Sequence, residues 1–313
     1  MSTLADIRLA HSPEEPRRHP AIMQWQIGNS CPLSQIWHFL LSENYTPANA
    51  TLLVIPQDVV EHWQQRVNFI YTKAIMKAVE VVNLVKDYGD FSAVRGISFE
   101  VHEGEIFGLI GPNGAGKTTT LRVISTLLQI TSGSVKVFGY DIPGESKEVR
   151  KVISYLPEDA GAYKNLTGRE YLEFIARFFG DGEEAKKIVG RGLEIANLGE
   201  RIKDKVDAYS KGMTRRLLVG RALMVNPKLA ILDEPTSGLD VINAQEIRKI
   251  INDSVERGLA VLLSSHNMLE VEFLCHRIAL ISDGRIVASG TPEELKREYG
   301  TRNIEEAFIK AIK

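Results

Sequence analysis

The sequence predicts an α/β fold in which a mostly parallel β-sheet is covered by helices. Three observations support this prediction. From residue 76 onwards, short runs rich in Val, Ile and Leu alternate with helical stretches. A buried-looking strand at 105–110 runs directly into a glycine-rich turn and then a helix. Helix-start signals recur along the chain, each with the spacing of a capping box.

The elements can be assigned in chain order. Strands are expected at 78–84, 94–101, 105–110, 229–232, 259–264 and 277–282. TGRE at 167–170 and TPEE at 291–294 mark helix starts, the second with proline at the first helical position. Residues 159–224 read as helices only, and 303–313 as one amphipathic helix.

The composition limits the classes of function and the cellular compartment that we expect. The 313 residues carry 38 Lys and Arg against 40 Asp and Glu, a net charge of -2 that gives no reason to expect nucleic acid. The two cysteines, Cys31 and Cys275, lack metal-ligand spacing, which favours a reducing cytosol. No apolar run approaches the roughly 18–20 residues of a membrane-spanning helix, so we expect no direct membrane insertion. The first 20 residues also lack the pattern of a secretory signal.

Residues 1–75 differ from the rest of the chain. They contain all three tryptophans and six of the twelve prolines, but a single glycine, Gly28. Only one lysine, Lys73, precedes residue 76. Two interpretations stay open: translation starts at Met76, or 1–75 form a small accessory domain. The predicted domains are therefore an N-terminal extension at 1–75 and a catalytic domain at 76–313.

The sequence GPNGAGKT at 111–118 matches the phosphate-loop pattern G-x-x-x-x-G-K-[ST] and lies between a strand and a helix, as that motif requires. The glycines let successive N–H groups point at phosphate oxygens. Lys117 adds a positive charge, and the Thr118 hydroxyl is placed to bind Mg²⁺. This motif makes the fold a P-loop nucleoside triphosphatase. The nucleotide contacts expected here are Gly111, Pro112, Asn113, Gly114, Ala115, Gly116, Lys117, Thr118 and Thr119.

Two adjacent carboxylates end the apolar strand LAIL, so both lie at the carboxyl edge of the sheet, where ligands bind in open α/β folds. Asp233 is expected in the Mg²⁺ shell. Glu234 is the candidate general base that activates the attacking water. Together with the phosphate loop, these residues predict hydrolysis of a nucleoside triphosphate.

From about residue 76 to the C-terminus, the motifs resemble the ATP-binding subunit of ABC transporters, and they occur in that family's order. Tyr88, in KDYGDFSAV, stands where the family stacks an aromatic ring on adenine. His266, in LLSSHNM, matches the switch histidine that contacts the γ-phosphate and joins Lys117 and Glu234 among the expected catalytic residues.

The resemblance extends to the family signature LSGGQ, which this chain replaces with YSKGM at 209–213. Ser210 and Gly212 match, whereas Tyr209, Lys211 and Met213 depart from the pattern. The resemblance implies that Ser210 and Gly212 bind the γ-phosphate of ATP held by the opposite subunit. SGLD at 237–240 resembles the loop that crosses the dimer interface and places Asp240 among the nucleotide contacts.

Glu158, in YLPEDAG, stands where the family usually carries the glutamine of its Q-loop. A carboxylate there can still bind Mg²⁺ through oxygen, so Glu158 joins Thr118 and Asp233 as an expected metal ligand. The same substitution is common in exporter-like members, which favours an exporter.

The resemblance implies a RecA-like α/β core at about 76–158 and 225–299, an antiparallel β subdomain, and an inserted helical subdomain at about 159–224. It also implies ATP and Mg²⁺ as cofactors. The expected partners are a second copy of the chain or a homologous cassette, and a separate transmembrane permease. The permease would hold the protein on the cytoplasmic face of the membrane. Docking is expected near Glu158 and the helix that starts at Thr167, with Tyr163 and Tyr171 as contacts.

Two alternatives remain. One is an ABC-type ATPase that acts in translation, DNA or cluster assembly without a membrane role, although the tandem cassettes, coiled-coil arms or zinc insertions typical of such proteins are not visible. The other is a regulatory module that binds ATP but barely hydrolyses it, as the changed signature could suggest. Glu234 argues against this second alternative, because degenerate sites in this family commonly lose that base.

Overall fold

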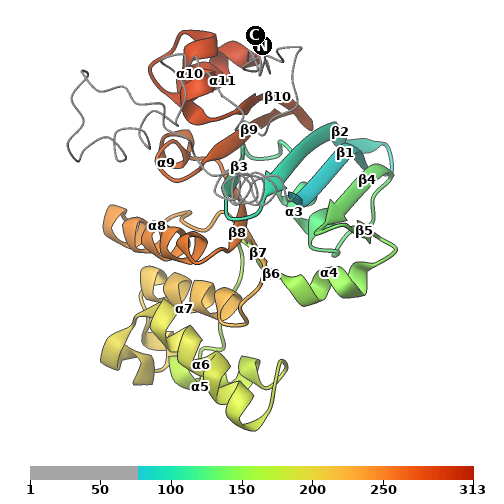
Figure 1. Cartoon of the computed structure of the whole chain (residues 1–313). Helices are drawn as coiled ribbons and strands as arrows, with labels where there is room; N and C mark the ends of the chain where they lie inside the picture. Colours follow the sequence, from blue (N-terminus) through green and yellow to red (C-terminus); the bar gives the residue numbers. More distant parts are fainter. Residues whose placement is uncertain (1–76) are drawn as a thin grey trace, which may run out of the picture. The chain divides into compact units, whose positions relative to one another are not determined.

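The computed structural model describes residues 77–313 (Figure 1). The expectation for residues 1–75 falls outside the described residues. Within the described part, none of the helices has the length and apolar character needed to cross a bilayer. The fold class is the predicted one, with a mixed sheet, an antiparallel sheet and helices.

An antiparallel sheet with strand order β2-β1-β4-β5 forms from the first part of the described chain. Its strands are β1 (Lys77–Tyr88), β2 (Phe91–His102), β4 (Ser132–Val137) and β5 (Tyr140–Ile142). β1 and β2 form a hairpin in which Tyr88 pairs with Phe91 at the tip. Just beyond the tip, the Ala93 carbonyl lies where a Cβ on Gly116 would stand. The hairpin therefore packs directly against the phosphate loop.

The second sheet contains the strands that lead into the expected site. Its strand order is β10-β9-β3-β8-β7-β6, and all neighbours are parallel except β10 and β9. The strands are β3 (Ile106–Ile110), β6 (Ile153–Leu156), β7 (Leu229–Asp233), β8 (Ala260–Ser265), β9 (Arg277–Ser282) and β10 (Arg285–Gly290). Because these parallel strands run in the same direction, β3, β7 and β8 deliver the phosphate loop, the acidic pair and His266 to one edge.

Both faces of this sheet are covered, and the side chains alternate between two hydrophobic cores. Ile106, Ile110 and Leu232 belong to the core shared with the helical segment, whereas Phe107 and Ile231 belong to the core shared with the antiparallel sheet. β3, β7 and β8 are buried along their whole length. Burial on both faces explains the continuous apolar runs seen in the sequence.

Only helices lie between β6 and β7, at the bottom of Figure 1. They are α5 (Gly168–Ala176), α6 (Gly182–Ala196), the 3₁₀ turns η1 (Gly199–Lys203) and η2 (Val206–Ala208), and α7 (Lys211–Leu223). The predicted capping box forms at the start of α5, where Thr167 and Glu170 exchange hydrogen bonds. α7 packs against α6, α8 and β6 and so joins this segment to the second sheet.

The remaining helices cover the second sheet or its connections. They are α3 (Lys117–Ile124), α4 (Ser146–Val152), α8 (Val241–Glu256), α9 (Met268–Val271), α10 (Pro292–Tyr299) and α11 (Ile304–Ala311). α10 starts with the predicted capping box and N-terminal proline, and α11 lies within the helix expected at 303–313. The sequence patterns did not predict β4, β5, β6, β10 or α4, which are short or lack a clear period.

Candidate functional site

The phosphate loop connects the buried strand β3 to α3. Gly114 and Gly116 have φ angles of +82° and +101°, which only glycine adopts readily. A Cβ on Gly111 would overlap the carbonyl oxygen of Ile281 in β9, so this position also needs glycine. No side chain caps α3, which begins at Lys117. Its first N–H groups are therefore available to bind a phosphate.

Lys117 is buried at the start of α3. Its Nζ donates to the carbonyl oxygens of Gly111 and Pro112, at 2.7 and 3.1 Å. The same ammonium lies 3.4 Å from Oε1 of Glu234, and both side chains are only 5% exposed. This Glu234 oxygen accepts no hydrogen bond within the described residues, so the ion pair at 3.4 Å is its nearest compensation. A buried point charge at the end of a flexible stem next to a phosphate loop is suited to binding a phosphate oxygen.

Asp233 ends β7 and is held through both carboxylate oxygens. Its Oδ1 accepts hydrogen bonds from Ser264 Oγ at 2.5 Å and from Thr118 Oγ1 at 3.2 Å. The Tyr155 hydroxyl donates to Oδ2 at 3.5 Å. Burial and the negative charge of Asp233 raise the pKa of the Tyr155 phenol, so the phenol stays protonated and remains a donor.

The donor set fits Mg²⁺. The Thr118 hydroxyl and the Asp233 carboxylate are hard oxygen donors placed side by side, and Mg²⁺ is usually held by one or two such groups together with water and substrate phosphates. Among residues 77–313, no three His, Cys, Asp or Glu side chains cluster closely enough to bind a metal by themselves. Bound there, Mg²⁺ would neutralise charge on the phosphates.

Glu234 has a strained backbone that is held at both ends of the residue. Its φ of +48° lies in the left-handed region, which costs a non-glycine residue on the order of 1 kcal/mol. Its N–H donates to Ser264 Oγ at 3.0 Å, and its carbonyl accepts from Arg215 Nη2 at 2.9 Å. Together with the Ser237 N–H, which donates to the same carbonyl at 3.2 Å, these two hydrogen bonds hold the conformation that turns the carboxylate back towards Lys117.

His266 meets the other oxygen of the Glu234 carboxylate. The distance from His266 Nδ1 to Glu234 Oε2 is 2.8 Å, and the histidine side chain is 45% exposed. Since Nδ1 is used by Glu234, Nε2 is the nitrogen left for a ligand. An imidazole can donate to a phosphate anion while its other nitrogen is held.

The structure thus brings together Lys117, Thr118, Asp233, Glu234 and His266 from the expected site. Sequence reasoning missed Ser264 and Arg215. Ser264 could have been found, because a polar residue ending the strand beside LAIL must lie next to its carboxylates in a parallel sheet. Arg215 is a charged residue among the buried positions of α7, which is a weaker signal.

The signature residues lie at the start of α7, which packs against the start of α8. Ser210 caps α7 and accepts a hydrogen bond from the Met213 N–H at 3.2 Å. Gly212 packs so tightly on Asn243 that a Cβ would overlap the amide group. Asp240 caps α8, and the hydrogen bonds that it accepts from Asn243 lower its pKa. Within the described residues, no hydrogen bond joins these groups to Glu234.

Tyr88 and Glu158 are both accessible. The Tyr88 ring is 47% exposed at the end of β1, with the ammonium of Lys86 5.0 Å from its centre. An exposed ring next to the phosphate loop is available for stacking. Glu158 follows β6, the strand beside β7, and its side chain is exposed. Among residues 77–313, the only hydrogen bond to Glu158 is the one that its backbone carbonyl accepts from Arg215 at 3.3 Å.

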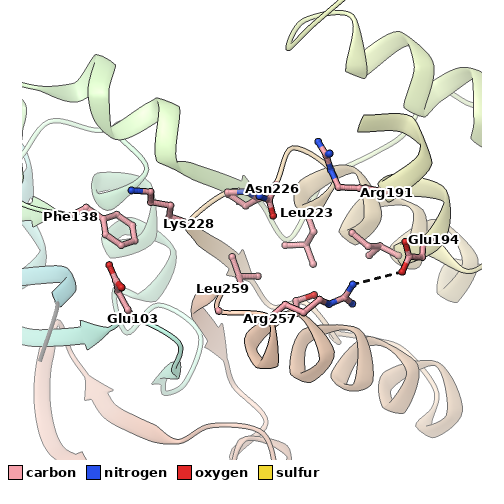
Figure 2. Close-up of a pocket in the computed structure, with 13 residues that line it drawn as sticks. Glu103, Phe138, Arg191, Glu194, Leu223, Asn226, Lys228, Arg257 and Leu259 are labelled. Atoms are coloured by element: carbon pink, nitrogen blue, oxygen red, sulfur yellow. Dashed lines mark ion pairs between the residues drawn. The ribbon is translucent and has the colours of Figure 1, made fainter. Parts of the chain in front are cut away.

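A cavity of about 380 Å³ lies at the opposite edge of the sheet, where Lys228 precedes β7 and Leu259 precedes β8 (Figure 2). The Lys228 ammonium lies 5.6 Å from the centre of the Phe138 ring, and Arg257 pairs with Glu194 at 3.8 Å. None of the expected nucleotide residues lines this cavity. It is therefore separate from the phosphate site.

The strand, phosphate loop, acidic pair and histidine together define a P-loop ATPase. The sequence model of the ABC transporter family matches residues 94–237. The linearmycin resistance ATP-binding protein LnrL of Bacillus subtilis (strain 168) is 41% identical over 244 residues, which cover 75% of this chain and 78% of LnrL. The daunorubicin/doxorubicin resistance ATP-binding protein DrrA of Streptomyces peucetius is 38% identical over 226 residues, which cover 72% of this chain and 68% of DrrA.

Among solved structures, an ATP-binding subunit of an ABC transporter matches with a TM-score of 0.67 and 29% identity, over 75% of this chain and 100% of that chain. The chain belongs to the ABC transporter family. It is an ATP-binding subunit that hydrolyses ATP to drive transport, and subunits of this kind work with membrane permeases. The prediction of ATPase activity coupled to transport is confirmed.

Proposed function

We propose that this chain energises an export-type transporter by hydrolysing Mg·ATP between two cassettes. One observation supports the catalytic part of this proposal: both carboxylate oxygens of Glu234 contact expected catalytic groups, Lys117 at 3.4 Å and His266 at 2.8 Å. Glu234 is the general base for the attacking water. Lys117 binds phosphate oxygens, and His266 contacts the γ-phosphate.

Each nucleotide is proposed to contact both cassettes. The phosphate loop, Tyr88 and the acidic pair hold ATP in one cassette, and Thr118, Asp233 and Glu158 hold Mg²⁺. Ser210 and Gly212 of the opposite cassette bind the γ-phosphate, and Asp240 lies at the dimer interface. The exposure of Val241 and Ile242, at 78% and 75%, supports this interface, because apolar side chains at the start of α8 gain from being covered. The proposal gives α7 and α8 a shared role in dimer contact.

Export is proposed from the relatives, because LnrL and DrrA are named as resistance proteins. The permease would hold the chain on the cytoplasmic side of the membrane. Its docking surface is an exposed aromatic patch on the helical segment, formed by Tyr163, Phe174, Phe178 and Phe179. The Phe174 ring meets Tyr163 at 5.5 Å and Phe178 at 5.4 Å, both edge to face.

The structure corrects one expectation about this surface. Tyr171 is 3% exposed and belongs to the hydrophobic core of the helical segment. A buried ring cannot contact a permease, and replacing it with Asp would unfold the segment rather than test docking. Tyr163 is 54% exposed and stays in the proposed surface.

The catalytic proposal is tested by Glu234→Gln, with Glu256→Gln as the control. Gln keeps the size of the side chain but is not a base, so we expect ATP to be bound and turnover to fall by at least about 100-fold. Glu256 is an exposed carboxylate at the end of α8, and its variant should behave as the wild type. Light scattering with ATP should show a stable dimer for Glu234→Gln only. Normal turnover in that variant would remove Glu234 from the role of base.

Docking is tested with Phe174→Asp in native membranes, against Phe273→Asp. Phe273 is 83% exposed on the connection that follows α9, outside the aromatic patch. We expect Phe174→Asp to keep its basal ATPase activity but to lose copurification with the polytopic partner. If the two variants copurify equally well with the partner, the aromatic patch is not the docking surface.

A further inference from the structure

Arg215 connects the helical segment to the catalytic carboxylate. It lies on α7, on the second turn after Ser210, and is 7% exposed. Its Nη2 donates to the carbonyl of Glu234 at 2.9 Å and to that of Glu158 at 3.3 Å. Both acceptors belong to segments that follow strands of the second sheet. One guanidinium group therefore spans from α7 to two residues of the expected site.

This arrangement is unusual for a buried cation. Among residues 77–313, Arg215 forms no salt bridge with a carboxylate, although Glu158, Asp233 and Glu234 are close enough to influence it. Burial lowers the pKa of the guanidinium, and those three carboxylates oppose that shift. The guanidinium is instead bound to two backbone carbonyls, so it holds those two carbonyls at fixed positions relative to α7.

Arg215 becomes more important when ATP is bound, if Lys117 and His266 act as proposed. Both side chains now hold the Glu234 carboxylate, and both would then turn to phosphate oxygens. The hydrogen bonds that remain to Glu234 are then those of its backbone: its N–H donates to Ser264 Oγ, and its carbonyl accepts from Arg215 and from the Ser237 N–H. Ser264 lies on β8 and Ser237 on the loop that follows β7, whereas Arg215 lies on α7 of the helical segment.

We infer that Arg215 is a positioning residue, which makes the orientation of the Glu234 carboxylate depend on the placement of α7 and Ser210. This inference rests on the proposed role of Glu234 as the base. A cassette whose α7 is misplaced would bind ATP but would hold the base in the wrong direction. Hydrolysis would follow only when the start of α7 is correctly held.

The test uses the full-length chain and the variants Arg215→Met and Arg215→Lys, with Arg216→Met as the matched control. Arg216 lies on the same helix and also donates to a backbone carbonyl, that of Asn197, but this carbonyl is at the end of α6 and outside the site. Steady-state kinetics gives kcat and KM, equilibrium binding gives the Kd of ATP, and thermal denaturation gives Tm.

We expect Arg215→Met to lower kcat by about 100-fold, the usual cost of a misplaced catalytic group, while the Kd of ATP changes less than about threefold. Arg215→Lys keeps a donor and should recover about tenfold of the loss, so its kcat stays below that of the wild type. Arg216→Met should lower Tm and leave kcat within about twofold. If Arg215→Met does not fold, Arg215→Lys decides, because kcat should then fall at unchanged Kd.

A wild-type kcat in Arg215→Met, or in Arg215→Lys when the Met variant does not fold, would overturn the inference. Equal losses of kcat in Arg215→Met and Arg216→Met would also overturn it, because they would show a merely structural role. The wild-type chain and Glu234→Gln are assayed first. Equal turnover in those two contradicts the proposed base, whatever the Arg215 variants do.

Discussion

Ser264→Ala tests the geometry of the acidic pair most directly. Ser264 is fully buried, and its hydroxyl donates to Asp233 Oδ1 while accepting the N–H of Glu234. Alanine removes both hydrogen bonds at a fully buried position. Asp233 keeps the hydrogen bond from Thr118, but the Glu234 N–H loses its acceptor.

The size of the effect follows from these contacts. A hydrogen bond to a charged group contributes about 1.5–3 kcal/mol, and a buried N–H without a partner costs about 1–3 kcal/mol. With Thr118 compensating in part, we expect a loss of about 2–4 kcal/mol. Ser265→Ala is the matched control, because Ser265 is also buried and its hydroxyl accepts one hydrogen bond, from the Asn267 N–H. That variant should lose about 1 kcal/mol.

Thermal denaturation of the nucleotide-free chain, followed by circular dichroism, measures the difference between the two variants. A difference of about 2 kcal/mol corresponds to about 4–8 °C in Tm for a domain of this size. Ser264→Ala should also lower kcat, because the hydrogen bond that holds the Glu234 N–H is lost. A Tm for Ser264→Ala equal to or above that of Ser265→Ala would refute this reasoning.

Two further predictions follow from local geometry. Gly111→Ala places a Cβ on the carbonyl of Ile281, so we expect a loss of about 1–3 kcal/mol in urea unfolding, together with weaker ATP binding; wild-type values for both would contradict the contact. At α5, the hydrogen bonds from Thr167 lower the pKa of Glu170. The carboxylate therefore stabilises the fold at neutral pH, and this contribution is lost as the pH falls through the lowered pKa. Glu170→Ala should lower Tm more at pH 7 than at pH 3.5, and an effect that is equal at both values would exclude an ionic cause.

The central strands and the phosphate loop could be predicted because local patterns determine them. A strand such as LAIL is apolar throughout, and the phosphate-loop motif needs glycines at fixed places whatever surrounds it. The edge strands β5 and β6 were missed because no local pattern determines them. β5 has three residues and β6 has four, too few for a period to be visible, and they are defined by the partners with which they pair.

The catalytic side chains of the site could be predicted from the sequence, but the groups that hold them in place could not. Motif spacing indicated Glu234 and His266, and the structure places them 2.8 Å apart. The groups that hold Glu234 in its left-handed conformation come from different elements, Arg215 from α7 and Ser264 from β8. Such contacts depend on tertiary packing, which no local pattern records. The same limit explains the error at Tyr171, since an aromatic residue on a helix can lie on either side of it.

The position of β3 in the sheet has a consequence for synthesis on the ribosome. β3 pairs with β8 and β9, which start at Ala260 and Arg277, and the phosphate loop is closed by a hydrogen bond from Gly284 to Ala115. Translation at about 5–20 residues per second needs on the order of ten seconds to pass from the loop to these partners. During that time the nascent chain carries the complete phosphate-loop sequence without the neighbours that shape it. ATP therefore cannot assist folding until nearly the whole chain has been made.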